Sequence, residues 1–414
     1  MRIVHFNTNG FGGAFEGSYR LHLALLNGGL DSNYVVLNQK KNGPRLKKVF
    51  LFDGHRRKST IIQKLIYRFG WPQSAEQKNW QFKKATRGAS YEVFSSPLSM
   101  IDILSDSRVK DSDLIHLHWV AGFIDYPSFF RKNKKPVVWT LRDLNPFSGC
   151  FHYETDLDNN PHLSKISREC EEIKRKSVAQ AQCRVYIAGI SQWITEKSRS
   201  SPIFQKMEHL TINNGLDHET YGKYTKEQAR KLLSVPENHL VFSFVGDHQE
   251  IHRKGLSLLI QVLEKLHKKN NIFLMTAGSS TNELLSRFKG NYSDFGFLDQ
   301  SQLDAFYTAS DAFIFPSLEE AFGNVIIESM ACGTPVISFS TGGALDVITH
   351  GINGLIARKK SVDDLTLLIQ EYIDGKYKFD PMKIKNVIAR DYSLNVLQEK
   401  YIQLYNKALD QHRG

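Results

Sequence analysis

The sequence lacks the defining features of several classes of protein. No apolar run approaches the roughly 18 residues that a membrane-spanning helix requires. Residues 1–8 are expected to form a β-strand, and they show neither the basic stretch nor the cleavage site of a signal peptide. No two cysteines form a Cys-x-x-Cys pair, which argues against a disulfide framework or a zinc site. The four cysteines are Cys150, Cys170, Cys183 and Cys332. We therefore expect a cytoplasmic protein.

Neither a metal ion nor a cofactor is expected. No Asp-x-Asp triplet stands out as a motif for a divalent ion, and the first glycine-rich segment does not follow the spacing of a dinucleotide-binding turn. Hydrophobic residues make up 41% and charged residues 23%, which excludes disordered and collagen-like chains. A chain of 414 residues is too long for one ordinary α/β core, so we expect two domains.

Outside one segment the chain has almost no excess of positive charge. Between Lys40 and Arg87 there are 14 lysines and arginines against two acids, Asp53 and Glu76. This segment therefore carries +12, and the rest of the chain sums to −1. Aromatic side chains such as Trp80 are interspersed among the cations.

The basic segment has three interpretations. The plainest is a solvated basic face over ordinary core residues. A mixture of cations and aromatic rings also suits an anionic membrane surface or an anionic, lipid-linked acceptor, which would make the protein peripheral on the inner face of the membrane. Binding to nucleic acid is the least favoured, because no nucleic-acid-binding motif accompanies the charge.

Short β-branched runs alternate with helical patterns along the chain, which predicts an α/β protein with parallel sheets. The expected strands are Arg2–Thr8, Asn33–Leu37, Leu114–Trp119, Val137–Leu141, Val185–Gly189, Leu240–Val245, Ile272–Ala277, Ala312–Pro316 and Pro335–Ser340. The pattern restarts near Gly215. We expect two doubly wound, Rossmann-like domains, residues 1–214 and 215–393, which face each other across a ligand-binding cleft. A final helix, at about 394–414, is expected to pack back onto the first domain.

The strongest chemical motif is the segment 317–337, Ser-Leu-Glu-Glu-Ala-Phe-Gly-Asn-Val-Ile-Ile-Glu-Ser-Met-Ala-Cys-Gly-Thr-Pro-Val-Ile. A helix is expected from about Phe322, with Glu320 at its entrance and Glu328 about two turns later. Carboxylates can accept hydrogen bonds from sugar and ribose hydroxyls, and the first turn of the helix favours phosphate. Two surface charges are the alternative, but the strand–helix–strand unit around them is apolar.

A second motif is the segment 244–255, Phe-Val-Gly-Asp-His-Gln-Glu-Ile-His-Arg-Lys-Gly. Arg253 and Lys254 lie between the end of an expected strand and the start of an expected helix. Two cations and a helix dipole converge there, which suits a diphosphate. We expect both cations to be exposed, and a simple solvated loop remains the alternative.

These motifs resemble those of the retaining GT-B glycosyltransferases called family 4 or group 1. Seven residues separate Glu320 from Glu328, and Phe322, Gly323 and the run Ala331–Val336 accompany them as in that family. The resemblance implies that Glu320 contacts the donor sugar and Glu328 the nucleotide ribose. It also implies that Phe322, Gly323 and Asn324 border the nucleotide-sugar.

The same resemblance implies that Arg253 and Lys254 hold the donor diphosphate. Many relatives carry an arginine directly after the first glycine of this loop, where the present sequence has Asp247. The phosphate-binding role therefore depends on Arg253 and Lys254 alone.

Two further glycine-rich loops follow expected strands. Gly12 and Gly13 would border the donor phosphate and the acceptor, as the resemblance implies. Gly342 and Gly343 could offer backbone N–H groups to the donor. Asp346 stands where relatives usually have glutamate, and it could equally be a helix cap.

A set of polar residues follows the expected strands of the first domain. Arg142 and Asp143 occupy a place where many relatives have His-Asp near the donor sugar, so no role of that histidine can be transferred to Arg142. A simple ion pair between them is the alternative. His118 is as plausible a structural residue as a functional one, and His152 is a weaker candidate still.

The sequence thus predicts a metal-independent hexosyltransferase that retains anomeric configuration. Its donor would be a nucleotide-sugar and its acceptor a saccharide or lipid-linked saccharide, in bacterial surface polysaccharide synthesis. Front-face attack, with the departing phosphate taking the acceptor proton, is the mechanism that the resemblance implies. The alternatives are a GT-B epimerase or phosphorylase, a non-catalytic scaffold that binds sugar nucleotides, and a Rossmann oxidoreductase.

Overall fold

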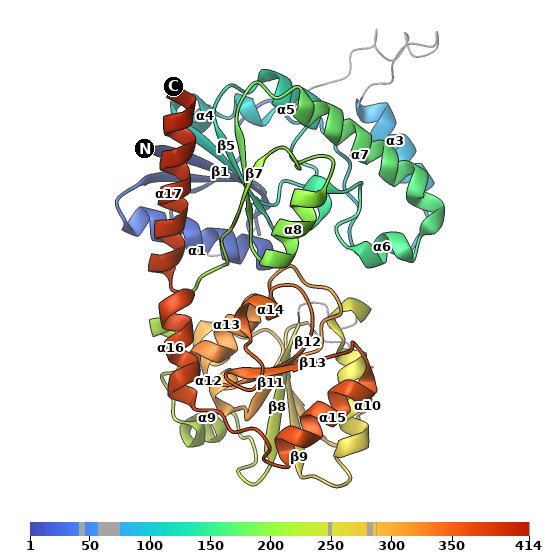
Figure 1. Ribbon diagram of the computed structural model, residues 1–414, viewed down its shortest axis with the longest axis vertical. Coiled ribbons are helices and arrows are strands. Elements are labelled where there is room, and N and C mark those ends of the chain that lie inside the picture. Colours follow the sequence, from blue (N-terminus) through green and yellow to red (C-terminus); the bar gives the residue numbers. More distant parts are fainter. Residues whose placement is uncertain (41–45, 57–74, 247–250, 280–284, 287, 414) are drawn as a thin grey trace. The chain divides into compact units, whose positions relative to one another are not determined.

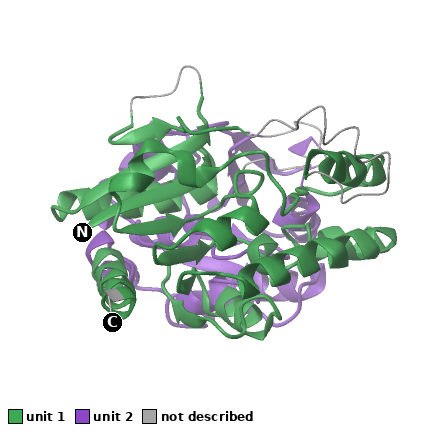
Figure 2. Cartoon of the chain, turned by 90° about the horizontal axis from the view of Figure 1, so that it is seen from above, with its two compact units in different colours: residues 1–213, 397–414 green, residues 214–396 purple. Residues whose placement is uncertain are grey.

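The computed structural model describes residues 1–40, 46–56, 75–246, 251–279, 285–286 and 288–413. The chain forms two compact units, coloured separately in Figure 2. The first comprises Met1–Asn213 and Leu397–Gly414, and the second Asn214–Val396. In each unit a parallel sheet is surrounded by helices (Figure 1).

The first unit has a seven-stranded sheet in the order β3-β2-β1-β4-β5-β6-β7. Its strands are β1 (Arg2–Asn9), β2 (Asp31–Asn38), β3 (Val49–Leu51), β4 (Leu114–Leu117), β5 (Val137–Leu141), β6 (Val185–Gly189) and β7 (Glu208–Thr211). Its helices are α1 (Gly13–Asn27), α3 (Ala75–Ala85), α4 (Ser107–Asp111), α5 (Tyr126–Lys132), α6 (Glu154–Asp158), α7 (Ser164–Ala179) and α8 (Gln192–Ser200). The order of the strands reverses direction between β1 and β4.

The second unit has a six-stranded sheet in the order β10-β9-β8-β11-β12-β13. Its strands are β8 (Leu240–Val245), β9 (Ile272–Ala277), β10 (Asn291–Asp294), β11 (Ala312–Phe315), β12 (Val336–Phe339) and β13 (Gly354–Ala357). Its helices are α9 (Lys226–Leu232), α10 (Leu256–Leu266), α12 (Gln300–Ala309), α13 (Asn324–Ala331), α14 (Ala344–Val347), α15 (Val362–Ile373) and α16 (Pro381–Asp391). Here the order reverses between β8 and β11.

Local sequence explains where the helices of the second unit begin and what they bury. Thr225 caps α9 in a capping box with Gln228. Helix α10 buries one apolar face, including Leu259 and Leu263, against the sheet. Gly323 is the N-cap of α13 and has φ 83°, a conformation that favours glycine, so this helix begins immediately after the motif glycine.

The last helix, α17 (Leu394–Arg413), belongs mostly to the first unit. Tyr405 hydrogen-bonds His116 of β4 at 2.7 Å, and Tyr401 hydrogen-bonds Thr140 of β5 at 2.7 Å. Both tyrosines are buried. The C-terminal segment therefore completes the core of the unit with which the chain begins.

Four strands of the two sheets were not expected from the sequence, namely β3, β7, β10 and β13. Each of them is the outermost strand on one side of its sheet.

Within the described part of the chain, no helix combines the length and the apolar character that crossing a membrane requires.

Candidate functional site

The charged candidates of the second unit lie at the carboxyl ends of two neighbouring strands. β8 and β11 pair in parallel at the point where the strand order reverses. Open α/β sheets bind ligands at such a switch point. Arg253 and Lys254 follow β8 in the turn His252–Lys254, and Glu320 follows β11 in the loop before α13.

Glu320 contacts both cations. Lys254 Nζ donates a hydrogen bond to Glu320 Oε2 at 2.7 Å, and Arg253 Nη1 lies 3.5 Å from the same oxygen. The Glu320 and Lys254 side chains are 18% and 24% exposed, so both remain accessible to a ligand. The cluster combines a hydrogen-bond acceptor with two positive charges in one small area.

The Glu320 carboxyl is ionised at any pH at which the protein would work. Burial raises its pKa, but the charges of Lys254 and Arg253 outweigh burial and hold the pKa at about 2. Glu320 can therefore accept hydrogen bonds from neutral hydroxyls, but it cannot serve as a general acid near neutral pH.

Arg253 is not the exposed cation that the sequence suggested. Its side chain is only 5% exposed, and Nη1 donates a hydrogen bond to the carbonyl of Glu319 at 2.7 Å. The carbonyl of Arg253 in turn accepts from the backbone N–H of Leu318 at 2.8 Å. Arg253 thus ties the loop after β8 to the loop after β11, which fixes the position of Glu320.

Gly342 and Gly343 let a third loop, after β12, approach the loop of Glu320. A Cβ atom on Gly342 would overlap the carbonyl oxygen of Glu320. A Cβ atom on Gly343 would lie 2.5 Å from Cα of Phe322. Any side chain at either position would push the two loops apart.

The remaining candidates of this motif are mostly buried. Glu328, on α13, is 7% exposed and accepts a hydrogen bond from the Tyr307 hydroxyl at 3.3 Å. Phe322 is 1% exposed. Asn324 Oδ1, on the first residue of α13, accepts from Asn214 Nδ2 at 2.9 Å. The motif is therefore held rigidly by its own neighbours.

Asp346 lies in the first turn of α14, whose N-cap residue is Gly343. An acidic side chain in the first turn suits the positive end of the helix dipole.

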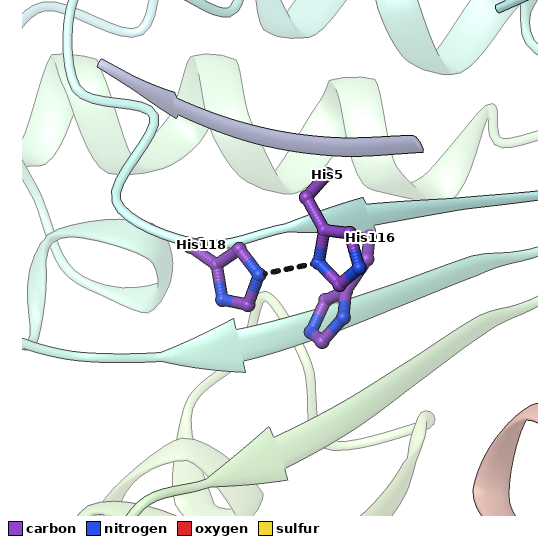
Figure 3. A group of neighbouring side chains, drawn as sticks. All are labelled: His5, His116 and His118. Carbon is purple, nitrogen blue, oxygen red and sulfur yellow. Dashed lines mark hydrogen bonds between the residues drawn. The ribbon is translucent and has the colours of Figure 1, made fainter. Parts of the chain in front are cut away.

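Three histidines cluster in the core of the first unit (Figure 3). His5 Nδ1 of β1 lies 2.9 Å from Nε2 of His118, which follows β4, and the two rings share a hydrogen bond. Both ring nitrogens of His116 are engaged, one by Tyr405 and one by Thr140, each at 2.7 Å. Burial lowers the pKa of all three histidines well below the ordinary value, so they are neutral at pH 7.

The three histidines are suitable ligands for a metal ion, but the charge beside them does not favour one. The candidate ligand atoms of His5, His116 and His118 lie within 4.8 Å of one another. Within the described chain, His5 Nε2 and His118 Nδ1 are buried without a hydrogen-bond partner. Arg142 adds to the lowering of all three pKa values, and its positive charge would also repel a cation. A neutral core network fits these residues better than a metal centre.

The two Asp-x-Asp triplets of the chain, 111–113 and 156–158, already have structural partners. Asp113 accepts a hydrogen bond from the backbone N–H of Arg2 at 2.7 Å. Asp156 accepts from the backbone N–H of Glu92 at 2.9 Å. One carboxylate of each triplet therefore already accepts a hydrogen bond from the backbone.

Asp143 is the centre of a second polar group in the first unit. It accepts hydrogen bonds from Trp119 Nε1 at 2.5 Å and from the backbone N–H of Asn145 at 3.0 Å. His152 Nδ1 also lies 2.5 Å from Asp143 Oδ2. His152, the weaker of the two histidine candidates in the sequence analysis, is therefore a direct partner of the predicted site residue Asp143.

The structure brings three predicted residues of the first unit to one place. His118, Arg142 and Asp143 line a single small cavity, together with His152. Arg142 is 8% exposed, and burial lowers the pKa of its guanidinium from the ordinary value. A chemical group in this cavity would meet a positive charge beside a carboxylate.

Gly12 and Gly13 lie at the start of α1. Gly12 is its N-cap, with φ 84°, and both glycines are exposed. A Cβ atom on either would meet nothing within 4 Å. The space in front of this helix is thus open to a ligand, and only the backbone conformation at Gly12 favours glycine.

Lys174 is a buried cation that the sequence gave little reason to select. Its Nζ donates hydrogen bonds to the carbonyls of Asn145 and Gly149, the latter at 2.6 Å, and lies 3.3 Å from that of Ser148. Burial lowers the pKa of Lys174 to about 8. Helical spacing does place Lys174 on the same face of α7 as buried Cys170, and this was the signal that could have revealed it.

Two predicted features lie partly or wholly outside the described residues. Asp247 is one of them, and residues 41–45 and 57–74 of the basic segment are the other. Of the described part of that segment, α3 exposes 63% of Trp80, and Lys84 Nζ lies 5.4 Å from the centre of its ring.

The match to a known protein family lies within the second unit. Residues 225–387 match the family model of glycosyl transferases group 1. This range covers most of the second unit, including Arg253, Lys254, Glu320 and Glu328. The second unit is thus similar to group 1 glycosyl transferases over most of its length.

Individual relatives extend the group 1 likeness beyond this domain. An uncharacterized glycosyltransferase of Methanocaldococcus jannaschii, MJ1607, is 27% identical over 73% of this chain and 77% of its own length. D-inositol 3-phosphate glycosyltransferase of Thermobispora bispora is 25% identical over 73% of this chain and 72% of its own. The capsular polysaccharide biosynthesis glycosyltransferase CapM of Staphylococcus aureus is 25% identical over 56% and 64%, respectively.

Solved structures cover nearly the whole chain. Sucrose-phosphate synthase of Thermosynechococcus elongatus has a TM-score of 0.69 and 16% identity, over 99% of this chain and 100% of its own. HepE of Anabaena, solved in complex with UDP and glucose, has a TM-score of 0.63 and 17% identity, over 98% and 100%. The chain therefore has the GT-B fold.

Proposed function

We propose that the protein is a retaining, metal-independent hexosyltransferase of family 4 that takes its sugar from a nucleoside-diphosphate sugar. The observation that carries this proposal is the cluster of Arg253, Lys254 and Glu320 at the switch point of a group 1 domain. Two cations suit the leaving diphosphate, and the adjoining carboxylate suits the hydroxyls of the sugar.

The chemistry follows from the charges at this point. As the bond between the anomeric carbon and the diphosphate breaks, negative charge grows on the phosphate, and Lys254 and Arg253 stabilise it. The acceptor oxygen then attacks from the same face, and its proton passes to the departing diphosphate. The products are a glycoside and a nucleoside diphosphate.

Glu320 is poorly suited to act as a nucleophile in this reaction. Its pKa of about 2 and its contacts with two cations lower its basicity and its charge density. A retaining route through a covalent sugar–enzyme intermediate would need a more nucleophilic carboxylate. This property favours front-face transfer over a double displacement.

The acceptor and the cellular setting belong to the same proposal. A saccharide or lipid-linked saccharide in bacterial surface polysaccharide synthesis is supported by the likeness to CapM, whose name places it in capsule biosynthesis. The basic segment Lys40–Arg87 would hold the protein to the inner face of the membrane, with exposed Trp80 and Lys84 on α3 as part of that surface.

The donor is testable by binding and by product analysis. A thermal-shift screen of nucleotide-sugars should select one donor, and transfer from it should release a nucleoside diphosphate only when an acceptor is present. NMR of the product should show the anomeric configuration of the donor. Inversion would contradict retention. Phosphate-dependent cleavage would indicate a phosphorylase, epimerisation of the donor an epimerase, and binding without turnover a scaffold.

A further inference from the structure

A large groove opens in the first unit beside the loop that follows β5. It has a volume of about 800 Å³ and is lined by the loop after β5 and by α6, α7 and α8. One side of this loop, with Asp143 and Asn145, lines the small cavity described above. The other side, with Leu144 and Phe147, lines the groove. The groove therefore lies next to the predicted site residues of this unit.

The floor of the groove is apolar and fixed. Phe147 and Phe151 are 6% and 3% exposed, and half-buried Tyr153 lies beside them. A Cβ atom on Gly149 would overlap the hydroxyl of Ser167, so the loop and α7 are in direct contact there. Lys174 holds the same loop by its backbone carbonyls. A pocket with an aromatic floor and polar walls is typical of a preformed site for a small organic ligand.

The walls of the groove are acidic in a chain whose net charge is +11. Four carboxylates and one cation line it among the described residues, and the cation, Lys197, donates to Glu154 at 2.6 Å. The other three carboxylates are Asp158, Glu171 and Glu196. Carboxylate oxygens accept hydrogen bonds from hydroxyl and ammonium groups, whereas they repel carboxylates and phosphates.

We propose that this groove binds the acceptor of the transfer reaction, and that the bound part of the acceptor is a saccharide without acidic groups, either uncharged or amino-bearing. The inference rests on the proposed glycosyltransferase function. The first unit would then have two binding surfaces of opposite charge. The basic segment Lys40–Arg87 would bind an anionic partner, and the acidic groove would bind the reacting saccharide.

The full-length protein can test this with three trisaccharides of equal length. The probes are the glucosamine trimer, the N-acetylglucosamine trimer and the galacturonic acid trimer, observed by saturation-transfer NMR and titration. The amino and neutral trimers should bind at millimolar concentration or below, and the acidic trimer should bind at least tenfold more weakly. Equal binding of the acidic trimer, or no binding of any trimer, would overturn the inference.

A matched pair of variants locates the binding. Glu171→Gln removes one charge from the wall of the groove, and it should weaken the glucosamine trimer by about 10-fold, the usual cost of losing a charged hydrogen bond. Glu172→Gln removes a charge from the next residue of α7, outside the groove, and should leave the affinity unchanged. Equal affinities in both variants would overturn the assignment to this groove.

Donor binding keeps this test separate from the proposed function. Stabilisation by the selected nucleotide-sugar should be the same in the wild type and in both variants, because neither residue lies in the second unit. If no nucleotide-sugar stabilises the protein, the proposed function fails. If the donor binds and the trimers show no charge preference, only the acceptor inference fails.

Discussion

Arg253 and Lys254 are neighbours in the chain but differ in what they contact. Lys254 reaches Glu320 from a partly exposed position, whereas Arg253 is buried and also holds the carbonyl of Glu319. The two adjacent cations of the proposed diphosphate site thus have separable structural roles. Lys254 adds charge, while Arg253 adds charge and joins two loops.

Alanine variants should show this difference. Lys254→Ala should lose about 10²–10³-fold in turnover with little change in melting temperature, because it removes a preorganised charge from an accessible side chain. Arg253→Ala should lose turnover and also about 1–3 kcal/mol of stability, because the buried carbonyl of Glu319 loses its partner. Steady-state transfer and thermal melting measure both effects, and near-normal turnover in both variants would mean that the diphosphate binds elsewhere.

Glu328 should act on donor binding and not on the chemical step. Its carboxylate is buried, and a ribose is held equally in the ground and transition states. Glu328→Gln, which preserves volume, should raise the KM for the donor by about 10-fold or more while kcat changes little. Tyr307→Phe, which removes the hydroxyl that Glu328 accepts, is the control and should have a smaller effect. A fall in kcat at unchanged KM would contradict the ribose role.

At the scale of structural elements, the loop from Asn145 to Gly149 depends on one buried lysine. Lys174 is the donor for carbonyls along this loop, and the loop separates the small cavity from the acidic groove. The charge of Lys174 is costly to bury, which is why its pKa falls to about 8.

This lysine should make stability rise with pH above about 8. The pKa is about 8 in the folded state against 10.5 in the unfolded chain, so between these values the unfolded state holds more protons. The contribution should grow by up to about 3 kcal/mol between pH 8 and 10.5. Denaturation of the wild type and of Lys174→Met across this range measures it. The rise should vanish in Lys174→Met and persist in Lys176→Met, whose side chain is 68% exposed on the same helix.

The sequence predicted inner strands well and outer strands poorly, for a physical reason. β5 and β6 are buried throughout and are mostly apolar in sequence, and their expected bounds are confirmed. β3 and β10 are edge strands, which need fewer apolar residues because one side has no neighbouring strand. Their short, partly exposed sequences do not differ from those of loops.

The candidate site was predictable where topology determines it. Residues that follow β8 and β11 must meet, because these strands are neighbours at the switch point, and this explains why Lys254 and Glu320 were found together. The burial of Arg253 and the contact between His152 and Asp143 were not predictable. Both depend on how side chains pack between segments that are distant in the sequence.

At the scale of the whole molecule, buried histidines distinguish the two units. His5, His22, His116, His118 and His152 are buried in the first unit, and no described histidine of the second unit is buried. Burial lowers the pKa of His22 to about 4 and those of His5, His116 and His118 well below the ordinary value. In the unfolded chain the four histidines with lowered pKa values would titrate near pH 6.5.

Mild acid should therefore weaken the first unit selectively. Below about pH 6.5 the unfolded state binds protons that the folded state does not bind. The free energy of unfolding therefore falls as the pH drops towards 4. His22 alone should contribute about 3 kcal/mol over this range. Hydrogen exchange at pH 7 and pH 5 should show protection lost in β1 and β4 and kept in β8 and β11. Equal loss in both units would contradict the role of the histidines.

The uneven charge of the chain leads to a prediction about membranes. If the segment Lys40–Arg87, with its charge of +12, holds the protein to an anionic surface, binding must weaken as salt screens the charges. Co-sedimentation with anionic and neutral liposomes should show binding to the anionic vesicles only, and high salt should abolish it. Equal, salt-insensitive binding to both kinds of vesicle would disprove the prediction.

The position of α17 has a consequence for the order in which the protein is made. β1 emerges from the ribosome before the second unit, but the hydrogen bonds from Tyr401 and Tyr405 to Thr140 and His116 cannot form until α17 has emerged. By then every strand of the second unit has been synthesised. The first unit is therefore begun before the second unit and completed after it, and a nascent chain that stops before α17 would have an exposed, incomplete core.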